Sequence, residues 1–160
     1  MPAVAKVQAD MARPGGDEFA RDPAIQALLG QYAAAFENAD VAGLIRLLRD
    51  DATFEMPPLP TWYVGREPVG RFLAARVLRQ PGSLRMIPAA ANGQPAFAAY
   101  LRGNDGVYRA HAVQVLTVTR SGVSRVVSFI GSGLFAAFGL PESVPTIPSP
   151  VTAVRRPGAA

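Results

Sequence analysis

The 160-residue sequence contains no cysteine and a single histidine, His111. The absence of cysteine excludes disulfides, thiolate nucleophiles and cysteine-bound zinc, and one histidine leaves too few ligands for a metal cluster. The sequence also lacks a glycine-rich loop of the kind that holds phosphates. We therefore expect neither a metal site nor a cofactor.

Long apolar runs and blocks of one charge are absent as well. No apolar stretch reaches the length of a bilayer span, and residues 1–10 lack the charged start and apolar stretch of a secretion signal. The net charge of +4 comes from arginines scattered along the chain, whereas nucleic-acid binding calls for a basic stripe. We expect a cytoplasmic protein with no membrane partner and no nucleic-acid partner.

What the sequence does contain is a patterned middle between two unpatterned ends. Residues 1–20 mix Ala, Pro, Gly and charges without a period, and residues 141–160 carry proline at short intervals. Both ends are predicted to be flexible tails. The middle, residues 21–140, has the size and the apolar content of one globular domain.

Three helices are predicted near the start of this domain. Asp22 and Asp40 are good N-caps, and a third helix follows Gly65 and stops at Pro81 and Gly82. The first helix has apolar residues at spacings of three and four: Ile25, Leu28, Leu29, Tyr32 and Phe36.

Strands dominate the rest of the domain. A short strand is predicted over residues 52–56, and further strands over 84–88, 95–102, 107–119 and 123–131, between the turn signals NG, GNDG and RSG. The fold class is α+β: a cone-shaped barrel in which three N-terminal helices pack on a curved, mostly antiparallel sheet. Gly131 and Gly133, followed by LFAAFGLP, predict that a short apolar helix or turn closes or lines the mouth of the cone.

The long strand over residues 107–119 contains the first candidate site residues. Strict alternation places Gln114 on one face together with Tyr108, Ala110, Ala112, Leu116 and Val118. A glutamine in the middle of an apolar face is either a satisfied core amide or a ligand contact.

His111 is the side chain whose ordinary pKa, about 6.5, suits proton transfer at neutral pH. Alternation points it to the other face, as it does for Glu55, so that the two could pair with each other. A bulge near Arg109 would turn His111 towards the pocket. A structural or interface role and a catalytic role therefore both remain open for His111.

The proline-rich segment EMPPLPTWYVGRE, residues 55–67, brings two aromatic side chains next to an acid. The prolines predict a rigid crossover that holds Trp62 and Tyr63 over the mouth of the cone. There the aromatics are either a hydrophobic plug or a lid that stacks on a flat ligand, and we prefer the lid.

A homodimer is predicted from the outer face of the same long strand. Val113, Val115 and Thr117 would be exposed there unless covered, and a contiguous apolar sheet face is rarely left in water.

The segment LLGQYAAAFENADVAGLIRLLRDDATFEMP, followed by VGRE, resembles the nuclear-transport-factor-2-like superfamily and is similar to its ketosteroid isomerase branch. The resemblance covers roughly residues 24–132. FEMPPLPTWYVGRE, together with ANGQPAF, YRAHAVQVL and LFAAFGLP, more narrowly resembles the SnoaL-like domain at the C-terminal end of some actinobacterial extracytoplasmic-function sigma factors.

This resemblance implies roles for individual residues. The oxyanion tyrosine of the isomerases falls on Tyr32, their catalytic aspartate falls on Met56, and their second oxyanion group falls on Gln114. Met56 cannot accept a proton, so isomerisation with that base is excluded, whereas the amide of Gln114 can still donate a hydrogen bond. The resemblance also implies a set of inward-facing residues: Phe97, Ala99, Ala110, Ala112, Val127, Phe129 and Gly131.

Two functions from different classes follow. The first is a cofactor-independent SnoaL-like cyclase or isomerase of secondary metabolism, which would close a ring on a polyketide-type or other apolar metabolite by acid/base catalysis. The catalytic candidates are His111, Glu55, Tyr32 and Tyr63, and the substrate-binding candidates are Trp62, Met56, Phe97, Tyr108, Gln114 and Phe129. The alternative is a regulatory domain that binds a ligand or a protein without chemistry.

Overall fold

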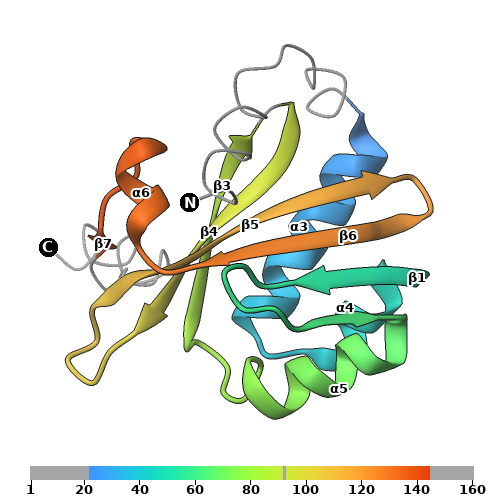
Figure 1. The fold of residues 1–160 in the computed structure, drawn as a ribbon, viewed down its shortest axis with the longest axis horizontal. Helices are drawn as coiled ribbons and strands as arrows, with labels where there is room; N and C mark the ends of the chain where they lie inside the picture. The colour runs from blue at the N-terminus through green and yellow to red at the C-terminus, as the bar shows by residue number, and fades with distance from the viewer. Residues whose placement is uncertain (1–21, 92, 145–160) are drawn as a thin grey trace, which may run out of the picture.

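One curved sheet with helices on both sides makes up the described part of the computed structural model, residues 22–91 and 93–144 (Figure 1). The described helices are α3 (Pro23–Glu37), α4 (Val41–Leu47), α5 (Arg66–Arg76) and α6 (Gly133–Ala137). The strands are β1 (Leu48–Glu55), β2 (Trp62–Val64), β3 (Leu84–Ala91), β4 (Gln94–Arg102), β5 (Tyr108–Thr119), β6 (Gly122–Ile130) and β7 (Ser143–Val144).

The caps expected from the sequence start the first two helices. The Asp22 carboxylate accepts a hydrogen bond from Ala24 N–H, and the Asp40 carboxylate accepts one from Gly43 N–H. Each satisfies a backbone donor that the first turn of a helix leaves free. The third helix, α5, ends at Arg76, before the predicted stop at Pro81. Within the described residues, no helix combines the length and apolarity needed to cross a bilayer.

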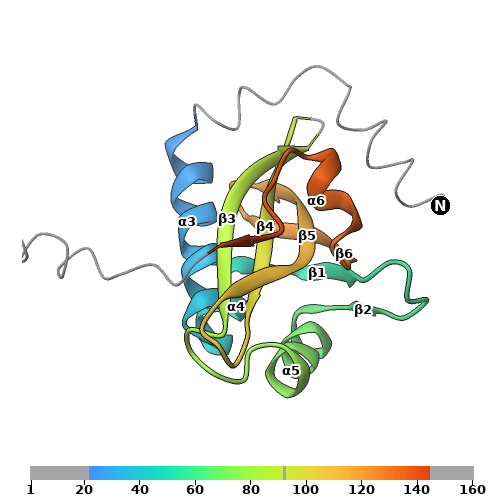
Figure 2. The same ribbon diagram turned by 90° about the vertical axis from the view of Figure 1, so that its left-hand side faces the viewer.

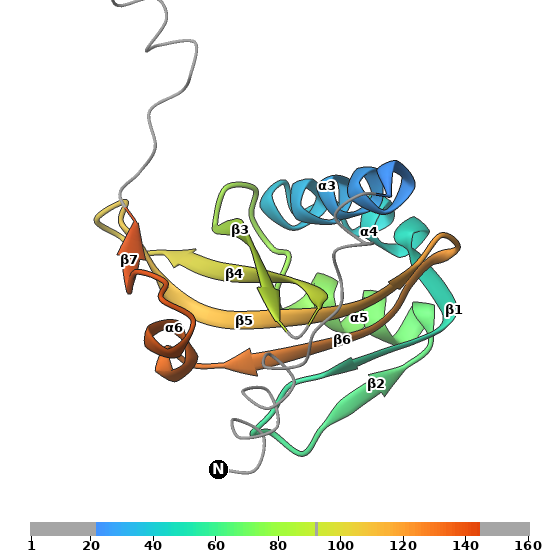
Figure 3. The same ribbon diagram turned by 90° about the horizontal axis from the view of Figure 1, so that it is seen from above.

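The sheet is open and mostly antiparallel. Its strand order is β2-β1-β6-β5-β4-β3, with β1 and β6 parallel and β7 added beside β5. Figure 3 shows the sheet curving around α3, α4 and α5. The predicted α+β class and the curved, mostly antiparallel sheet are confirmed, but the sheet does not close into a barrel. The described part contains four helices: the three predicted N-terminal ones, and α6 in the segment where a short apolar helix or turn was predicted.

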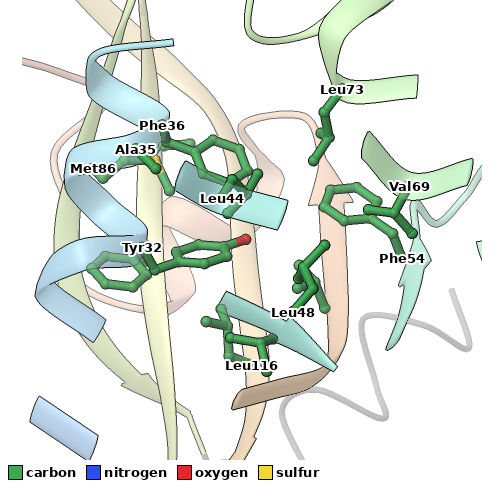
Figure 4. Packing of buried hydrophobic residues seen from close by; sticks show 14 of the residues in the cluster. Tyr32, Ala35, Phe36, Leu44, Leu48, Phe54, Val69, Leu73, Met86 and Leu116 are labelled. Atoms are coloured by element: carbon green, nitrogen blue, oxygen red, sulfur yellow. The ribbon is translucent and has the colours of Figure 1, made fainter. Parts of the chain in front are cut away.

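Two hydrophobic clusters lie on opposite faces of the sheet. The inner cluster fills the space between α3, α4, α5 and the inner face; Figure 4 shows Tyr32, Phe36 and Leu116 within it. The outer cluster joins α6 to the other face and consists of Ala98, Tyr100, Val113, Leu134 and Phe135. In Figure 2, α3 and α6 accordingly lie on opposite sides of the sheet.

The C-terminal part of the fold differs from the prediction in two respects. The short helix α6 covers the outer face, where Val113 is fully buried, and does not cap the cone. Residues 141–144, assigned from the sequence to a tail, belong to the fold, since β7 pairs with β5 and the Tyr100 hydroxyl donates to Pro141 O. The rest of both predicted tails lies outside the described residues. The homodimer remains a prediction, but α6 covers part of the face on which it was based.

Candidate functional site

The centre of the inner face contains a buried hydrogen-bonded pair, Tyr32 of α3 and Gln114 of β5. The Tyr32 hydroxyl donates to Gln114 Oε1 over 2.7 Å, and the two residues are 1% and 4% exposed. The rings of Phe36 and Phe97 lie 4.8 and 5.7 Å from the Tyr32 ring. Burial raises the pKa of Tyr32 well above its ordinary value of 10. Tyr32 is therefore a neutral phenol that is unsuited to act as a base.

The direction of this hydrogen bond alters the expected site chemistry. Two donors were expected here, one from Tyr32 and one from Gln114, but the Tyr32 proton is bonded to Gln114 Oε1. A glutamine amide has one oxygen and an NH₂ group, so the NH₂ group of Gln114 is a hydrogen-bond donor while Oε1 accepts from Tyr32. The pair therefore offers a neutral donor in an apolar setting.

Ser128 of β6 is a further polar residue of the inner face that was not predicted from the sequence. It pairs directly opposite Gln114 and is 3% exposed. The family resemblance implied that Val127 and Phe129, the residues on either side of Ser128, would face inward instead. The register of the β5–β6 pairing shifts by one residue between Thr117, which pairs with Arg125, and Val118, which pairs with Val123. This shift leaves Ser124 of β6 without a counterpart in β5. One extra residue reverses the faces of the strand beyond it.

Met56 and Phe97 lie where the sequence placed them. Both belong to the inner cluster, at 8% and 3% exposed, alongside the small residues Ala99 and Ala112. Met56 follows β1 and continues the inward side of Phe54. The structure thus brings Tyr32, Gln114, Met56 and Phe97 together on the inner face.

The inward orientations predicted for Phe129 and Tyr108 are wrong. Both side chains pack against the outer cluster, and the Tyr108 hydroxyl donates to Gly82 O over 2.7 Å. For Phe129 the reason is the extra residue in β6. For Tyr108 it is a second irregularity, in β5: Ala99 pairs with Ala112 and Tyr100 pairs with Ala110, which leaves His111 unpaired in the register. Ala110, also expected to face inward, packs against the outer cluster as well.

His111 is therefore the extra residue of a β-bulge, as considered for the region near Arg109. Ala112 beside it belongs to the inner cluster, whereas Ala110 packs on the outer one. The His111 side chain is half-buried, and this burial lowers its pKa from the ordinary value of 6.5. The imidazole is therefore mostly neutral at pH 7, which is the form that can accept a proton.

Glu55 lies on the outer face, away from Tyr32 and Gln114. Its neighbours Phe54 and Met56 face the inner cluster, while its carboxylate forms an ion pair with Arg125, with 2.8 Å between Oε2 and Nε. The partner of Glu55 is thus Arg125 and not the His111 considered from the sequence. The structure does not bring Glu55 together with the inner-face pair.

Trp62 and Tyr63 point to opposite faces of the edge strand β2, because successive side chains of a strand alternate. Tyr63 pairs opposite Phe54, and its ring stacks on Phe72 of α5 at 4.5 Å. Trp62 pairs opposite Glu55 and is 62% exposed. The prediction that both aromatics form one lid is therefore wrong. The short strand β2, absent from the prediction, is the reason.

A shallow cleft elsewhere on the surface is lined by Arg49, Asp50, Asp51, Arg66 and Ser121. Arg49 pairs with Asp51 at 3.1 Å, and Arg66 pairs with Asp50 at 2.9 Å. Exposed pairs of this kind contribute little to stability. Since each arginine has an acidic partner, the cleft offers no concentrated charge for a ligand.

Comparison with known proteins assigns the family. The model of the SnoaL-like domain matches residues 29–128, which include both members of the Tyr32–Gln114 pair. The chain belongs to the SnoaL-like family. This assignment confirms the resemblance found in the sequence.

A curated relative supports the same family assignment. The chain is 40% identical over 123 residues to the ECF RNA polymerase sigma factor SigG of Mycobacterium tuberculosis; the match covers 76% of this chain and 33% of that protein. This SnoaL-like chain thus spans about a third of the length of the curated relative.

Solved structures share the fold. A presumed ketosteroid isomerase from Kribbella flavida matches with a TM-score of 0.51 and 24% identity, over 77% of this chain and 82% of the other. An NTF-2 like protein of unknown function from Burkholderia xenovorans matches with a TM-score of 0.56 and 13% identity, over 77% and 94%. At these identities the likeness concerns the fold of the SnoaL-like domain alone.

Proposed function

We propose that this SnoaL-like chain is a ligand-binding domain that works without chemistry of its own. It would bind a small apolar or aromatic metabolite that carries a neutral hydrogen-bond acceptor. The observation that carries this proposal is the Tyr32–Gln114 pair, because it places a neutral amide donor in an apolar cluster. An uncharged acceptor, such as a carbonyl, matches such a donor without the cost of burying a charge.

Three side chains considered for acid/base catalysis are unsuited to it, which supports binding over catalysis. Met56 occupies the position of the isomerase aspartate, and Glu55 is engaged by Arg125 on the outer face. Tyr32 keeps its proton because burial raises its pKa. Acid/base catalysis requires a titratable group within reach of the reacting proton, and none of these three side chains meets that requirement.

A regulatory setting is supported by the sigma-factor relative. That protein is about three times as long as its matching region, so the SnoaL-like part is one portion of a larger transcription protein. By analogy, ligand occupancy of this chain would be read out by a protein partner.

The binding proposal is tested by ligand-induced thermal shift. A panel of aromatic and polyketide-type ketones would be screened against the wild type, Gln114→Leu and Gln94→Leu. Gln94 is the matched control, because its amide donates to Thr117 Oγ1 and Leu116 O. We expect a shift in the wild type and in Gln94→Leu that is lost in Gln114→Leu. An equal shift in all three proteins would contradict the proposal.

A second candidate function, cofactor-independent ring closure or isomerisation, is favoured by His111. This half-buried imidazole is mostly neutral at pH 7 and lies in a bulge next to the inward-facing Ala112. The assay compares turnover of epoxide and polyketide-type substrates by the wild type and by His111→Ala. Turnover in the wild type that is lost in His111→Ala, with binding retained, would replace the binding proposal with a cyclase or isomerase.

A further inference from the structure

The segment from Gly131 to Val144, which we call the C-terminal strap, crosses the outer face after β6 ends. Its helix α6 buries Leu134 and Phe135, at 4% and 0% exposed, against Tyr100 and Val113. Gly131 at the start of the strap and Gly139 after α6 have φ of +108° and +70°. Such backbone angles suit glycine and allow the chain to turn sharply at both ends of the helix.

The strap pairs with the part of the β5 edge that lies beyond the end of β6. β6 pairs with β5 as far as Ile130 opposite Ala112, and β7 pairs with β5 at Tyr108 and Arg109. Between these two regions lies the bulge residue His111. A strand edge without a neighbour would leave backbone groups unpaired, and the strap provides the missing partners.

Two backbone hydrogen bonds connect the strap to the bulge from either side. Gly131 N–H donates to His111 O over 2.7 Å, and Ala110 N–H donates to Glu142 O over 2.8 Å. His111 is thus bracketed by the first residue of the strap and by one near its end. A movement of the strap must break one or both of these bonds.

Tyr100 of β4 anchors the strap at two points. Its hydroxyl donates to Pro141 O over 2.8 Å, and its ring meets the ring of Phe135 edge to face at 5.2 Å. Tyr100 also pairs directly opposite Ala110, the residue before His111. The same side chain therefore contacts the strap and belongs to the strand pair that contains the bulge.

We propose that the C-terminal strap positions His111 by holding the β5 bulge, with Phe135 and Tyr100 as its anchors. The strap is then a positioning element for the chain's one histidine. The charged residues of β5 and the strap are Arg109, whose guanidinium pairs with Asp105 at 2.8 Å, and Glu142.

Since the chain has one histidine, its imidazole resonances give an unambiguous NMR titration. The full chain would be titrated as wild type, Phe135→Ala and Tyr100→Phe. The matched control is Tyr108→Phe, which removes a hydroxyl that donates to Gly82 O and not to the strap. Exchange of the Ala110 amide reports whether the strap is attached.

In Phe135→Ala and Tyr100→Phe, we expect the His111 pKa to rise towards the ordinary value of about 6.5 as water reaches the bulge. The Ala110 amide should exchange faster in the same variants, while Tyr108→Phe should match the wild type. An unchanged His111 pKa in both strap variants would overturn the proposal, whether or not the Ala110 amide exchanges faster. An equal rise in Tyr108→Phe would also overturn it, because general loosening would then be the cause. Should Phe135→Ala fail to fold by circular dichroism, Tyr100→Phe decides alone.

Discussion

The two faces of the sheet bury similar residue types in different ways. The inner face is covered by three helices and encloses large side chains around the Tyr32–Gln114 pair. The outer face is covered by one five-residue helix and the strand that follows it. The inner cover consists of helices that also pack on one another, whereas the outer cover is a single short segment, residues 131–144. We therefore expect the inner face to govern global stability and the outer face to govern local opening.

The largest expected effect on stability comes from replacing a buried phenylalanine with alanine, once on each face of the sheet. Phe36→Ala on the inner face should lower the free energy of unfolding by about 3–5 kcal/mol, because the surrounding side chains cannot close the cavity. Phe135→Ala should cost less, since detachment of the strap limits the loss. Urea unfolding followed by circular dichroism measures both. Equal losses would mean that the strap unfolds together with the whole domain.

Removal of the Tyr32 hydroxyl should have the next largest effect. Tyr32→Phe leaves the buried Gln114 Oε1 without its donor, which costs about 1–3 kcal/mol. Tyr100→Phe on the outer face removes a donor to Pro141 O, a backbone oxygen at an exposed residue, and should cost less. Urea unfolding again makes the comparison. A larger loss in Tyr100→Phe would reverse the assignment of the stability-governing face.

The pH dependence of stability tests the burial of His111. Burial lowers its pKa in the folded chain, so on acidification the unfolded chain takes up the proton first. The contribution of His111 is therefore complete above about pH 6.5 and is lost as the pH falls through its folded-state pKa. His111→Gln should flatten the dependence of unfolding free energy on pH in that window. A slope equal to that of the wild type would show that His111 is equally hydrated in both states.

The smallest effect is expected for the ion pair on the outer face. Glu55→Gln removes the charge that pairs with Arg125, and such partly exposed pairs contribute about 0–1 kcal/mol. The variant should also keep any ligand-induced thermal shift, because Glu55 lies across the sheet from Gln114. Loss of the thermal shift would place Glu55 in the binding site and would favour the acid/base cyclase or isomerase over the binding domain.

Much of the fold could be predicted because local signals agree with it. The caps at Asp22 and Asp40 begin helices, and the turn signals NG, GNDG and RSG separate the long strands. The family resemblance likewise placed Tyr32, Gln114 and Met56 together. The short strand β2 was missed because three residues are too few to show a period of two, and its pairing with β1 forms only in the sheet.

The candidate site was predicted less well. Which face of the sheet a side chain occupies depends on unbroken alternation along the strand, and one extra residue reverses it. The unmatched residues Ser124 in β6 and His111 in β5 reverse the alternation, so Phe129 and Tyr108 face outward and Ser128 faces inward. No residue type marks either bulge in the sequence. A bulge is set by pairing with a neighbouring strand, which is a long-range contact.

The helices and the long strands could be predicted from the period of the apolar residues and from the turn signals, and the family could be predicted from the resemblance of its segments. The folded chain was needed to show that the Tyr32 hydroxyl donates to Gln114, that Glu55 forms an ion pair with Arg125, and that residues 131–144 cover the outer face. The physical reason is that hydrogen-bond direction and strand register depend on partners 70 to 82 residues away along the chain, and a local pattern does not contain that information.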